Sequence, residues 1–271
     1  HHLERSPSVG KGQAVRYGVQ VLASCGDRCG AGAAWPLPGW SPETVEDCVQ
    51  GLATLGDAIP ISHLRGHIKA LELSCPSLAW ALSTALWRMD FPSKRAERHT
   101  AWLLVGPPSE FEKRLQEIRD SWHAGASPSH PHPRLKIKIA GWSPQQVVHA
   151  CQLTQCLWPE CRLRLDANRS WPLAAVVEVT EVIKHPCIDY WEEPCDLSQM
   201  GRALQLGIPI ALDESLRQTE AHPFLDQAAA WILKPTLLGS LQTVLDWQKK
   251  GLDRGIPIIW SSCFEGAATL E

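Results

Sequence analysis

Five charged residues stand at the ends of evenly spaced apolar runs, and this spacing limits the fold more than any other feature of the chain. They are Lys138, Asp166, Glu192, Asp213 and Lys234, separated by 28, 26, 21 and 21 positions. Each interval has room for one short buried strand and one returning helix. Parallel strands joined by right-handed crossovers end at the same edge of a sheet. We therefore expect these five side chains to converge at one mouth.

The wider rhythm of the chain predicts an α/β fold of the TIM-barrel kind. Apolar runs typical of buried strands lie at 101–105, 135–139, 162–166, 188–192, 209–213, 231–234 and 256–261. Helices are expected near 108–119, 143–156, 172–184, 197–206, 218–228 and 239–253. This repetition favours a (β/α)8-type barrel over an open doubly wound sheet, and no G-x-G-x-x-G motif follows a strand. Because seven such strands are found, we expect the eighth strand to be missing from this chain.

The first third of the chain lacks this alternation and indicates a small α+β domain. Residues 13–24 are expected to form a strand, and the stretch GDRCGAGAA that follows is expected to be turn-rich. Ser41 is a plausible N-cap for the next helix, and a second helix is expected over 76–88. We therefore predict an N-terminal α+β capping domain at 1–99 and a barrel domain at 100–271 with a truncated C-terminal end.

Composition excludes several classes of protein. The formal net charge of −3 gives no reason to expect a nucleic-acid or anionic membrane partner. No apolar run approaches the roughly 20 residues that span a bilayer. The ten cysteines include no C-x2-C pair, so we expect reduced, buried or partly buried thiols in a cytoplasmic protein.

The charged side chains at the strand ends suggest metal-assisted proton chemistry. Lys136 and Lys138 point to the same side of one strand, and two lysines inside a barrel mouth are expected to depress each other's pKa, leaving a neutral amine to act as a base. Taken alone, they could instead mark a solvated edge strand, and Asp166 could be only a helix N-cap. Three carboxylates at successive strand ends are better explained by one divalent cation, either Mg2+ or Mn2+. Arg164 faces the same side as Asp166 and could pair with a carboxylate.

Several motifs, taken in order, resemble those of a known family. LRLDANRSW, WEEPC, ALDESL, ILKPTLLGS and the K-x-K of LKIKI are similar to the o-succinylbenzoate synthases of the enolase superfamily. The resemblance runs from PLPGWSPET at 36–44 to WSSCFEG at 260–266, which is most of the chain. It implies a capping domain followed by a modified (β/α)7β barrel.

The resemblance also implies an activity and roles for individual residues. The enzyme would be a carbon–oxygen lyase of menaquinone or phylloquinone biosynthesis. It would dehydrate 2-succinyl-6-hydroxy-2,4-cyclohexadiene-1-carboxylate to o-succinylbenzoate through α-proton abstraction and a metal-stabilised enediolate. Mg2+ would be bound by Asp166, Glu192 and Asp213, with Lys138 as the acid/base and Lys234 steadying the enediolate from the opposite side. Six further residues would orient Lys138 or contact the substrate: Lys136, Arg164, Gly239, Ser240, Ser261 and Ser262.

Two other functions compete with this hypothesis. The first is racemisation or epimerisation of N-acylamino acids or dipeptides on the same scaffold, because lysines on opposite faces of an α-carbon also suit a 1,1-proton transfer. The second is a non-catalytic binding protein, which the intact set of five charged residues argues against. In each enzymatic case the partner is a small-molecule carboxylate.

Overall fold

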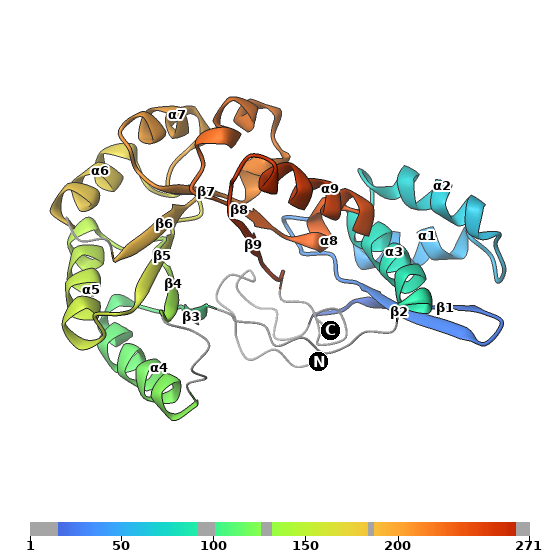
Figure 1. Cartoon of the computed structure of the whole chain (residues 1–271), viewed down its shortest axis with the longest axis horizontal. Helices are drawn as coiled ribbons and strands as arrows, with labels where there is room; N and C mark the ends of the chain where they lie inside the picture. The colour runs from blue at the N-terminus through green and yellow to red at the C-terminus, as the bar shows by residue number, and fades with distance from the viewer. Residues whose placement is uncertain (1–15, 92–100, 126–131, 184–186, 264–271) are drawn as a thin grey trace. The chain divides into compact units, whose positions relative to one another are not determined.

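The computed structural model describes residues 16–91, 101–125, 132–183 and 187–263, shown in Figure 1. The described residues fall into two compact units. One unit takes its residues from His1–Glu97 and Ile232–Glu271, and the other from Arg98–Trp231. The predicted division into a capping domain at 1–99 and a barrel at 100–271 stays a prediction.

A seven-stranded sheet carries the charged residues, and its strands are neighbours in chain order. The strands are β3 (Trp102–Leu104), β4 (Arg134–Lys138), β5 (Arg162–Asp166), β6 (Ile188–Glu192), β7 (Ile210–Leu212), β8 (Ala230–Leu233) and β9 (Ile258–Trp260). Each neighbouring pair from β3 to β8 is parallel. The seven predicted strands are confirmed, and in the described part of the chain β3 and β9 are the two end strands of the sheet.

Helices cover the outer face of this sheet in the second unit, as Figure 1 shows for β3 to β7. They are η1 (Pro108–Glu110), α4 (Phe111–Gly125), α5 (Pro144–Leu157), α6 (Leu173–Val182), α7 (Leu197–Gln205), η2 (Glu214–Arg217) and η3 (Thr219–Gln227). The predicted helix near 218–228 is the 3₁₀ segment η3, in which Pro223 lacks the N–H that an α-helix needs.

Alternation along the strands separates the core of this unit from its charged face. Leu135 and Ile137 of β4 are fully buried, as are Leu163 and Leu165 of β5. Because side chains on a strand alternate between its two faces, the residues between these apolar ones face the opposite side. On β4 these residues include Lys136 and Lys138, which belong to the candidate site.

The first unit contains an antiparallel hairpin packed on helices. Its elements are β1 (Val19–Cys25), β2 (Arg28–Ala34), α1 (Val45–Ala53), α2 (Ile61–Leu71), α3 (Pro76–Asp90), α8 (Pro235–Leu238) and α9 (Leu241–Leu252). The interpretation of GDRCGAGAA as turn was wrong, because most of it forms β2. A Cβ on Gly30 would lie 2.1 Å from the Ala85 carbonyl oxygen, and one on Gly32 would lie 1.9 Å from that of Ala81. Glycine is therefore needed for β2 to lie directly against α3.

Local sequence signals explain where the helices of the first unit begin. The predicted helix at 76–88 is confirmed as α3, which starts with Pro76 in its first turn. The predicted N-cap Ser41 was wrong, since α1 is capped by Thr44 in a reciprocal capping box with Asp47. The Ser41 hydroxyl instead accepts a hydrogen bond from the Leu37 N–H at 2.8 Å, which holds the loop before the helix.

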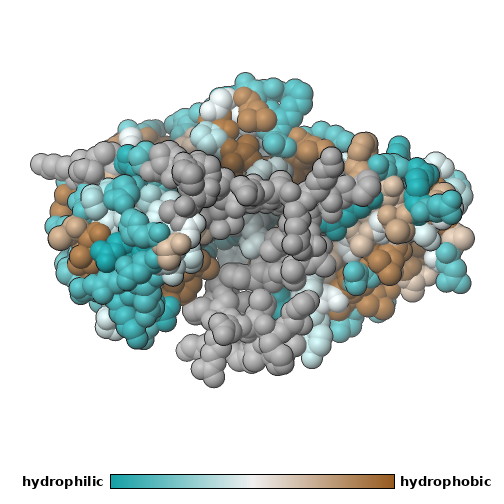
Figure 2. Space-filling view, turned by 60° about the horizontal axis from the view of Figure 1, so that its bottom comes forward, coloured by the Kyte–Doolittle hydropathy of each residue, from teal (hydrophilic) through white to brown (hydrophobic). Residues whose placement is uncertain are grey.

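Three further properties of the described residues concern their hydropathy and their cysteines. No helix within the described ranges has the length and apolar character to cross a bilayer. On the face drawn in Figure 2, hydrophilic and hydrophobic residues are interspersed over the described part. All ten cysteines are free thiols; seven are buried, and Cys25, Cys29 and Cys156 are exposed.

Candidate active site

Strand register brings three of the five predicted residues into one row. Lys138 at the end of β4 is paired with Asp166 at the end of β5, and Asp166 is paired with Glu192 at the end of β6. Asp166 and Glu192 are buried, at 0% and 2% exposure. The predicted convergence of strand ends is thus seen for these three side chains, all within the second unit.

Lys136 lies among the carboxylates of this row. Its Nζ is 2.6 Å from Glu192 Oε1 and 2.8 Å from Asp166 Oδ2. Burial lowers the pKa of Lys136, but the charges of Glu192, Asp166 and Asp213 outweigh burial and raise the pKa above its ordinary value. The expectation that Lys136 and Lys138 depress each other into a neutral amine is therefore wrong for Lys136, because three nearby acids dominate one nearby base.

Lys138 makes the shortest contact in the row. Its Nζ lies 2.5 Å from Asp166 Oδ2 and donates a hydrogen bond to Asn168 Oδ1 at 3.0 Å. Burial raises the pKa of Asp166, but the two ammonium groups outweigh it and bring the pKa down to about 2. Asp166 is therefore ionised throughout the physiological range, and Lys138 is held at its carboxylate.

Asp213 is positioned by a second buried carboxylate, Glu193. One Glu193 oxygen accepts the backbone N–H groups of Asp213 and Ser215 at 2.8 and 2.9 Å. The other accepts from the Ser215 hydroxyl at 2.7 Å and from Arg169 Nε at 2.9 Å. Sequence reasoning placed one of the two adjacent glutamates inward without giving Glu193 this role. The two adjacent acids before Pro194 carried this signal. Neighbouring residues of a strand point to opposite faces, so only one of the two glutamates can point toward the row.

Backbone strain is concentrated in the loops beside the row. Asn168, Arg169 and Glu193 have φ values of 45°, 59° and 42°, in the region that non-glycine residues rarely occupy. Strained residues persist where surrounding contacts fix them, and such positions cluster at functional sites. Here the Arg169 N–H donates to the Glu193 carbonyl at 2.7 Å, so the two strained loops hold each other.

The predicted substrate-binding residues differ in their surroundings. Arg164 lies 3.6 Å from Asp189 through Nε, with its guanidinium carbon 5.0 Å from the centre of the Tyr190 ring. Gly239 ends α8 at a φ of 115°, where a side chain would be strained. Ser240 caps α9 and donates a hydrogen bond to Glu72.

The last two serines follow β9. The Ser261 N–H donates to the Leu233 carbonyl at 2.9 Å, and its hydroxyl donates to the Ser262 carbonyl at 3.4 Å.

Lys234 follows β8 in the first unit, where its Nζ lies 5.9 Å from the centre of the Trp40 ring. Trp40 lies in the loop that precedes α1, so Lys234 and this loop are in contact range.

The donor chemistry of the second unit fits a hard divalent cation. Asp166, Glu192 and Asp213 are all buried, and all three act on the Lys136 ammonium. Their oxygens do not all approach within 4.8 Å of one another among the described residues, and Lys136 bridges two of them. Three buried carboxylates that act on one ammonium form a strongly negative group, and a bound divalent cation would stabilise it.

Comparison with known proteins identifies the family. An "Enolase C-terminal domain-like" family model matches residues 114–243. The o-succinylbenzoate synthase of Pasteurella multocida is 31% identical over 267 residues, covering 94% of this chain and 76% of that protein. That of Haemophilus influenzae is 30% identical over 270 residues with the same coverage. The chain belongs to the o-succinylbenzoate synthase family.

Solved structures confirm the predicted fold class. The o-succinylbenzoate synthase of Thermosynechococcus elongatus, complexed with magnesium in its active site, superposes with a TM-score of 0.74 at 24% identity over 94% of this chain and 79% of that one. A dipeptide epimerase from Methylococcus capsulatus complexed with magnesium gives a TM-score of 0.74 at 20% identity, covering 93% and 79%. This chain and these two structures therefore share one fold.

Proposed function

We propose that this chain dehydrates 2-succinyl-6-hydroxy-2,4-cyclohexadiene-1-carboxylate to o-succinylbenzoate in menaquinone or phylloquinone biosynthesis. The observation that carries the proposal is the row of Lys138, Asp166 and Glu192 across three parallel strand ends. A base beside two buried carboxylates is the arrangement that α-proton abstraction from a carboxylate substrate needs. Membership in the o-succinylbenzoate synthase family supports this substrate over others.

In this proposal Mg2+ is held by Asp166, Glu192 and Asp213, and Mn2+ could substitute. The bound cation would supply the positive charge that stabilises a second negative charge developing on the substrate carboxylate, and it would balance the carboxylates that now hold both ammonium groups. Lys136 would remain an ammonium close to Glu192, where it can orient the substrate carboxylate. Arg164 on β5 would help to orient Lys138 or the substrate.

Lys138 performs both proton transfers in the proposed reaction. Its neutral amine accepts the proton from the carbon next to the carboxylate, and the resulting ammonium donates a proton to the departing hydroxyl. The C–H and C–O bonds break, a ring double bond forms and water leaves, so atoms and charges balance. Asn168 Oδ1, at 3.0 Å from Nζ, would hold the amine in place during both transfers.

The remaining assignments rest on the sequence. Lys234 is proposed to stabilise the charge on the substrate from the side opposite Lys138. Gly239, Ser240, Ser261 and Ser262 are proposed to contact the succinyl or carboxylate end of the substrate. The cytoplasmic location and the absence of a nucleic-acid partner also stay predictions.

The experiment that tests the proposal uses Lys138→Ala and Lys234→Ala with the purified protein, Mg2+ and the cyclohexadiene acid. Acid–base groups contribute about 10²- to 10⁴-fold, so we expect kcat to fall roughly 1000-fold in each variant. The matched control is Lys113→Ala on α4, because Lys113 is 81% exposed, and it should leave kcat unchanged.

The same preparation separates dehydration from the racemase or epimerase alternative. Wild-type protein in D2O should form o-succinylbenzoate and should not exchange deuterium into N-acylamino acids or dipeptides. Deuterium incorporation without dehydration would favour the racemase. Wild-type kcat in Lys138→Ala would contradict the proposed role of this residue.

A further inference from the structure

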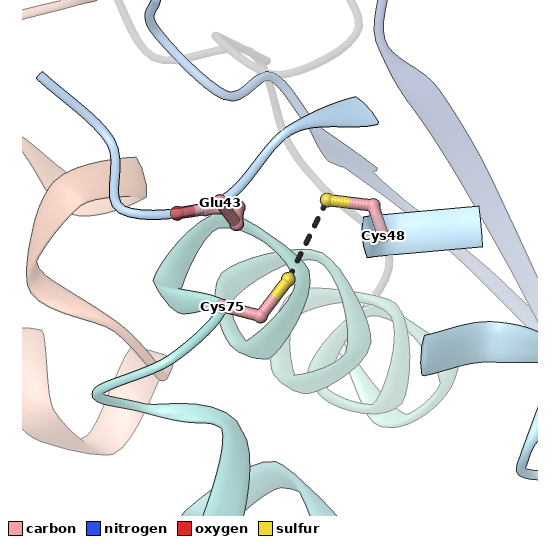
Figure 3. Close-up of side chains that lie close together, drawn as sticks. All are labelled: Glu43, Cys48 and Cys75. Carbon is pink, nitrogen blue, oxygen red and sulfur yellow. Dashed lines mark hydrogen bonds between the residues drawn. The ribbon is translucent and has the colours of Figure 1, made fainter. Parts of the chain in front are cut away.

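A second group of metal-ligating side chains lies in the first unit. Glu43, Cys48 and Cys75 are all buried, and each offers a ligand atom within 4.8 Å of the other two. Glu43 precedes the cap of α1, Cys48 lies on α1, and Cys75 is the N-cap of α3. Figure 3 shows the two sulfurs facing each other with Glu43 beside them. The group is independent of the strand-end row in the second unit.

The separation of the two sulfurs suits joint binding of one ion. Cys48 Sγ and Cys75 Sγ are 3.6 Å apart, and either thiol can donate to the other. Two sulfurs bound to one zinc at about 2.3 Å in tetrahedral geometry lie roughly 3.8 Å apart. A disulfide would need about 2.05 Å. The observed distance is therefore close to that of two sulfurs bound to one ion and far from that of a disulfide.

The Glu43 carboxylate provides the second, independent observation. Glu43 is 4% exposed, and its Oε1 accepts the Ser77 N–H at 2.9 Å, in the first turn of α3. Its Oε2 is buried and has no hydrogen-bond partner among the described residues. A buried carboxylate oxygen without a partner costs free energy, so such atoms call for an explanation. A cation shared with the two sulfurs is one that the geometry allows.

The three side chains are presented by the starts of two helices. Cys75 is the N-cap of the 15-residue helix α3, and Cys48 lies in the first part of α1. Ser77 Oγ lies 3.6 Å from Cys48 Sγ, so a hydroxyl oxygen that could act as a fourth ligand is close to the group. The surrounding cluster of Leu64, Leu78 and Leu82 excludes water, which strengthens electrostatic attraction to an ion.

We propose that Glu43, Cys48 and Cys75 form a structural site for a thiophilic divalent cation of the zinc class. Two thiolates and one carboxylate suit a borderline-soft ion and not Mg2+, which prefers oxygen ligands in octahedral geometry. The ion would cross-link the start of α1 to the start of α3 in the core of the first unit. The two cysteines are 27 positions apart, which explains why a search for short C-x-x-C spacing does not find the site.

The test begins with wild-type protein freed of metal under reducing conditions and titrated with Co2+ in excess Mg2+. We expect a thiolate-to-cobalt absorption band that saturates at one ion per chain and is abolished by one equivalent of Zn2+. Added Mg2+ should not displace the cobalt. Failure of wild-type protein to develop the band overturns the proposal without reference to any variant or to catalytic activity.

Variants then locate the bound ion. The double variant Cys48→Ser with Cys75→Ser should lose the band, and Glu43→Gln should weaken cobalt binding by at least about 10-fold, the low end of the effect of altered metal-site partners. The matched control is Cys25→Ser with Cys29→Ser, because these two thiols are exposed, and it should keep the band.

Two results would overturn the assignment even if metal binds. One is a band that survives in the Cys48 and Cys75 double variant but disappears in the Cys25 and Cys29 control. The other is a disulfide between Cys48 and Cys75 in protein purified under reducing conditions. It would appear as an intact mass two hydrogens below that of the reduced chain, with the loss mapped to these two cysteines. Should the double variant not fold, the wild-type titration decides.

Discussion

Glu193→Gln tests how the second unit positions Asp213. The Glu193 side chain is fully buried, and its two oxygens accept four hydrogen bonds. Two come from the backbone N–H groups of Asp213 and Ser215, and two come from the Ser215 hydroxyl and Arg169. Glutamine has nearly the same shape, but one of its ends is an NH2 donor. One pair of donors must therefore face another donor.

The size of the stability loss can be estimated from the glutamine orientation that keeps more of the original hydrogen bonds. If the amide oxygen keeps the two backbone N–H groups, the NH2 group faces Arg169 while the Ser215 hydroxyl rotates to accept. The lost charge-assisted bond is worth about 1.5–3 kcal/mol. The guanidinium keeps its hydrogen bond to the Ser215 hydroxyl at 2.9 Å but loses its carboxylate partner, which adds to the cost. Because Arg169 is 25% exposed and water can partly replace the bond, we expect a loss of about 3 kcal/mol in the free energy of unfolding. Affinity for Mg2+ should also fall about 10- to 100-fold, because the Asp213 N–H then bonds a neutral amide oxygen whose position is no longer fixed by Arg169.

Urea-induced unfolding and Mg2+ titration measure these two effects. The matched control is Glu178→Gln, an exposed residue of α6 whose carboxylate accepts one hydrogen bond from Gln145, and it should change the free energy of unfolding by less than about 0.5 kcal/mol. Equal unfolding midpoints for wild type and Glu193→Gln would refute the reasoning. Reduced stability with unchanged Mg2+ affinity would show that Glu193 stabilises the fold without positioning a metal ligand.

Two further predictions concern the exposed thiols and Asn168. At pH 8 the native protein should react rapidly with a thiol reagent at three cysteines only, with the other seven reacting on unfolding; burial raises the pKa of Cys161, one of the seven, to about 12. More than three rapidly reacting thiols, identified by peptide mapping, would contradict the buried positions. Asn168→Ala removes the oxygen that accepts from Lys138, so kcat should fall about 10-fold with little change in KM, and steady-state kinetics with wild-type kcat would exclude a positioning role.

The fold could be predicted from the sequence because apolar runs recur at regular intervals. The seven strands lie where the runs indicated, and the helix starting at Pro76 follows a local signal. The second hairpin strand escaped prediction because its glycines serve a tertiary purpose. Gly30 and Gly32 let β2 approach the α3 backbone, and no local pattern distinguishes that use of glycine from a turn.

The candidate site could be predicted in its residues but less well in its electrostatics. Strand-end spacing found Lys138, Asp166 and Glu192, which register places in one row. The direction of the Lys136 pKa shift was misjudged because it depends on how many carboxylates lie nearby in space. The role of Glu193 depends on contacts with a loop about 20 residues further along the chain, which spacing alone does not reveal.

The metal dependence of o-succinylbenzoate formation tests the central claim most directly. Protein treated with EDTA should form no product from the cyclohexadiene acid, and Mg2+ should restore turnover in the wild type but not in Asp166→Asn. Product formation by the chelated protein, or full restoration in Asp166→Asn, would contradict the claim that three buried carboxylates hold the cation on which the reaction depends.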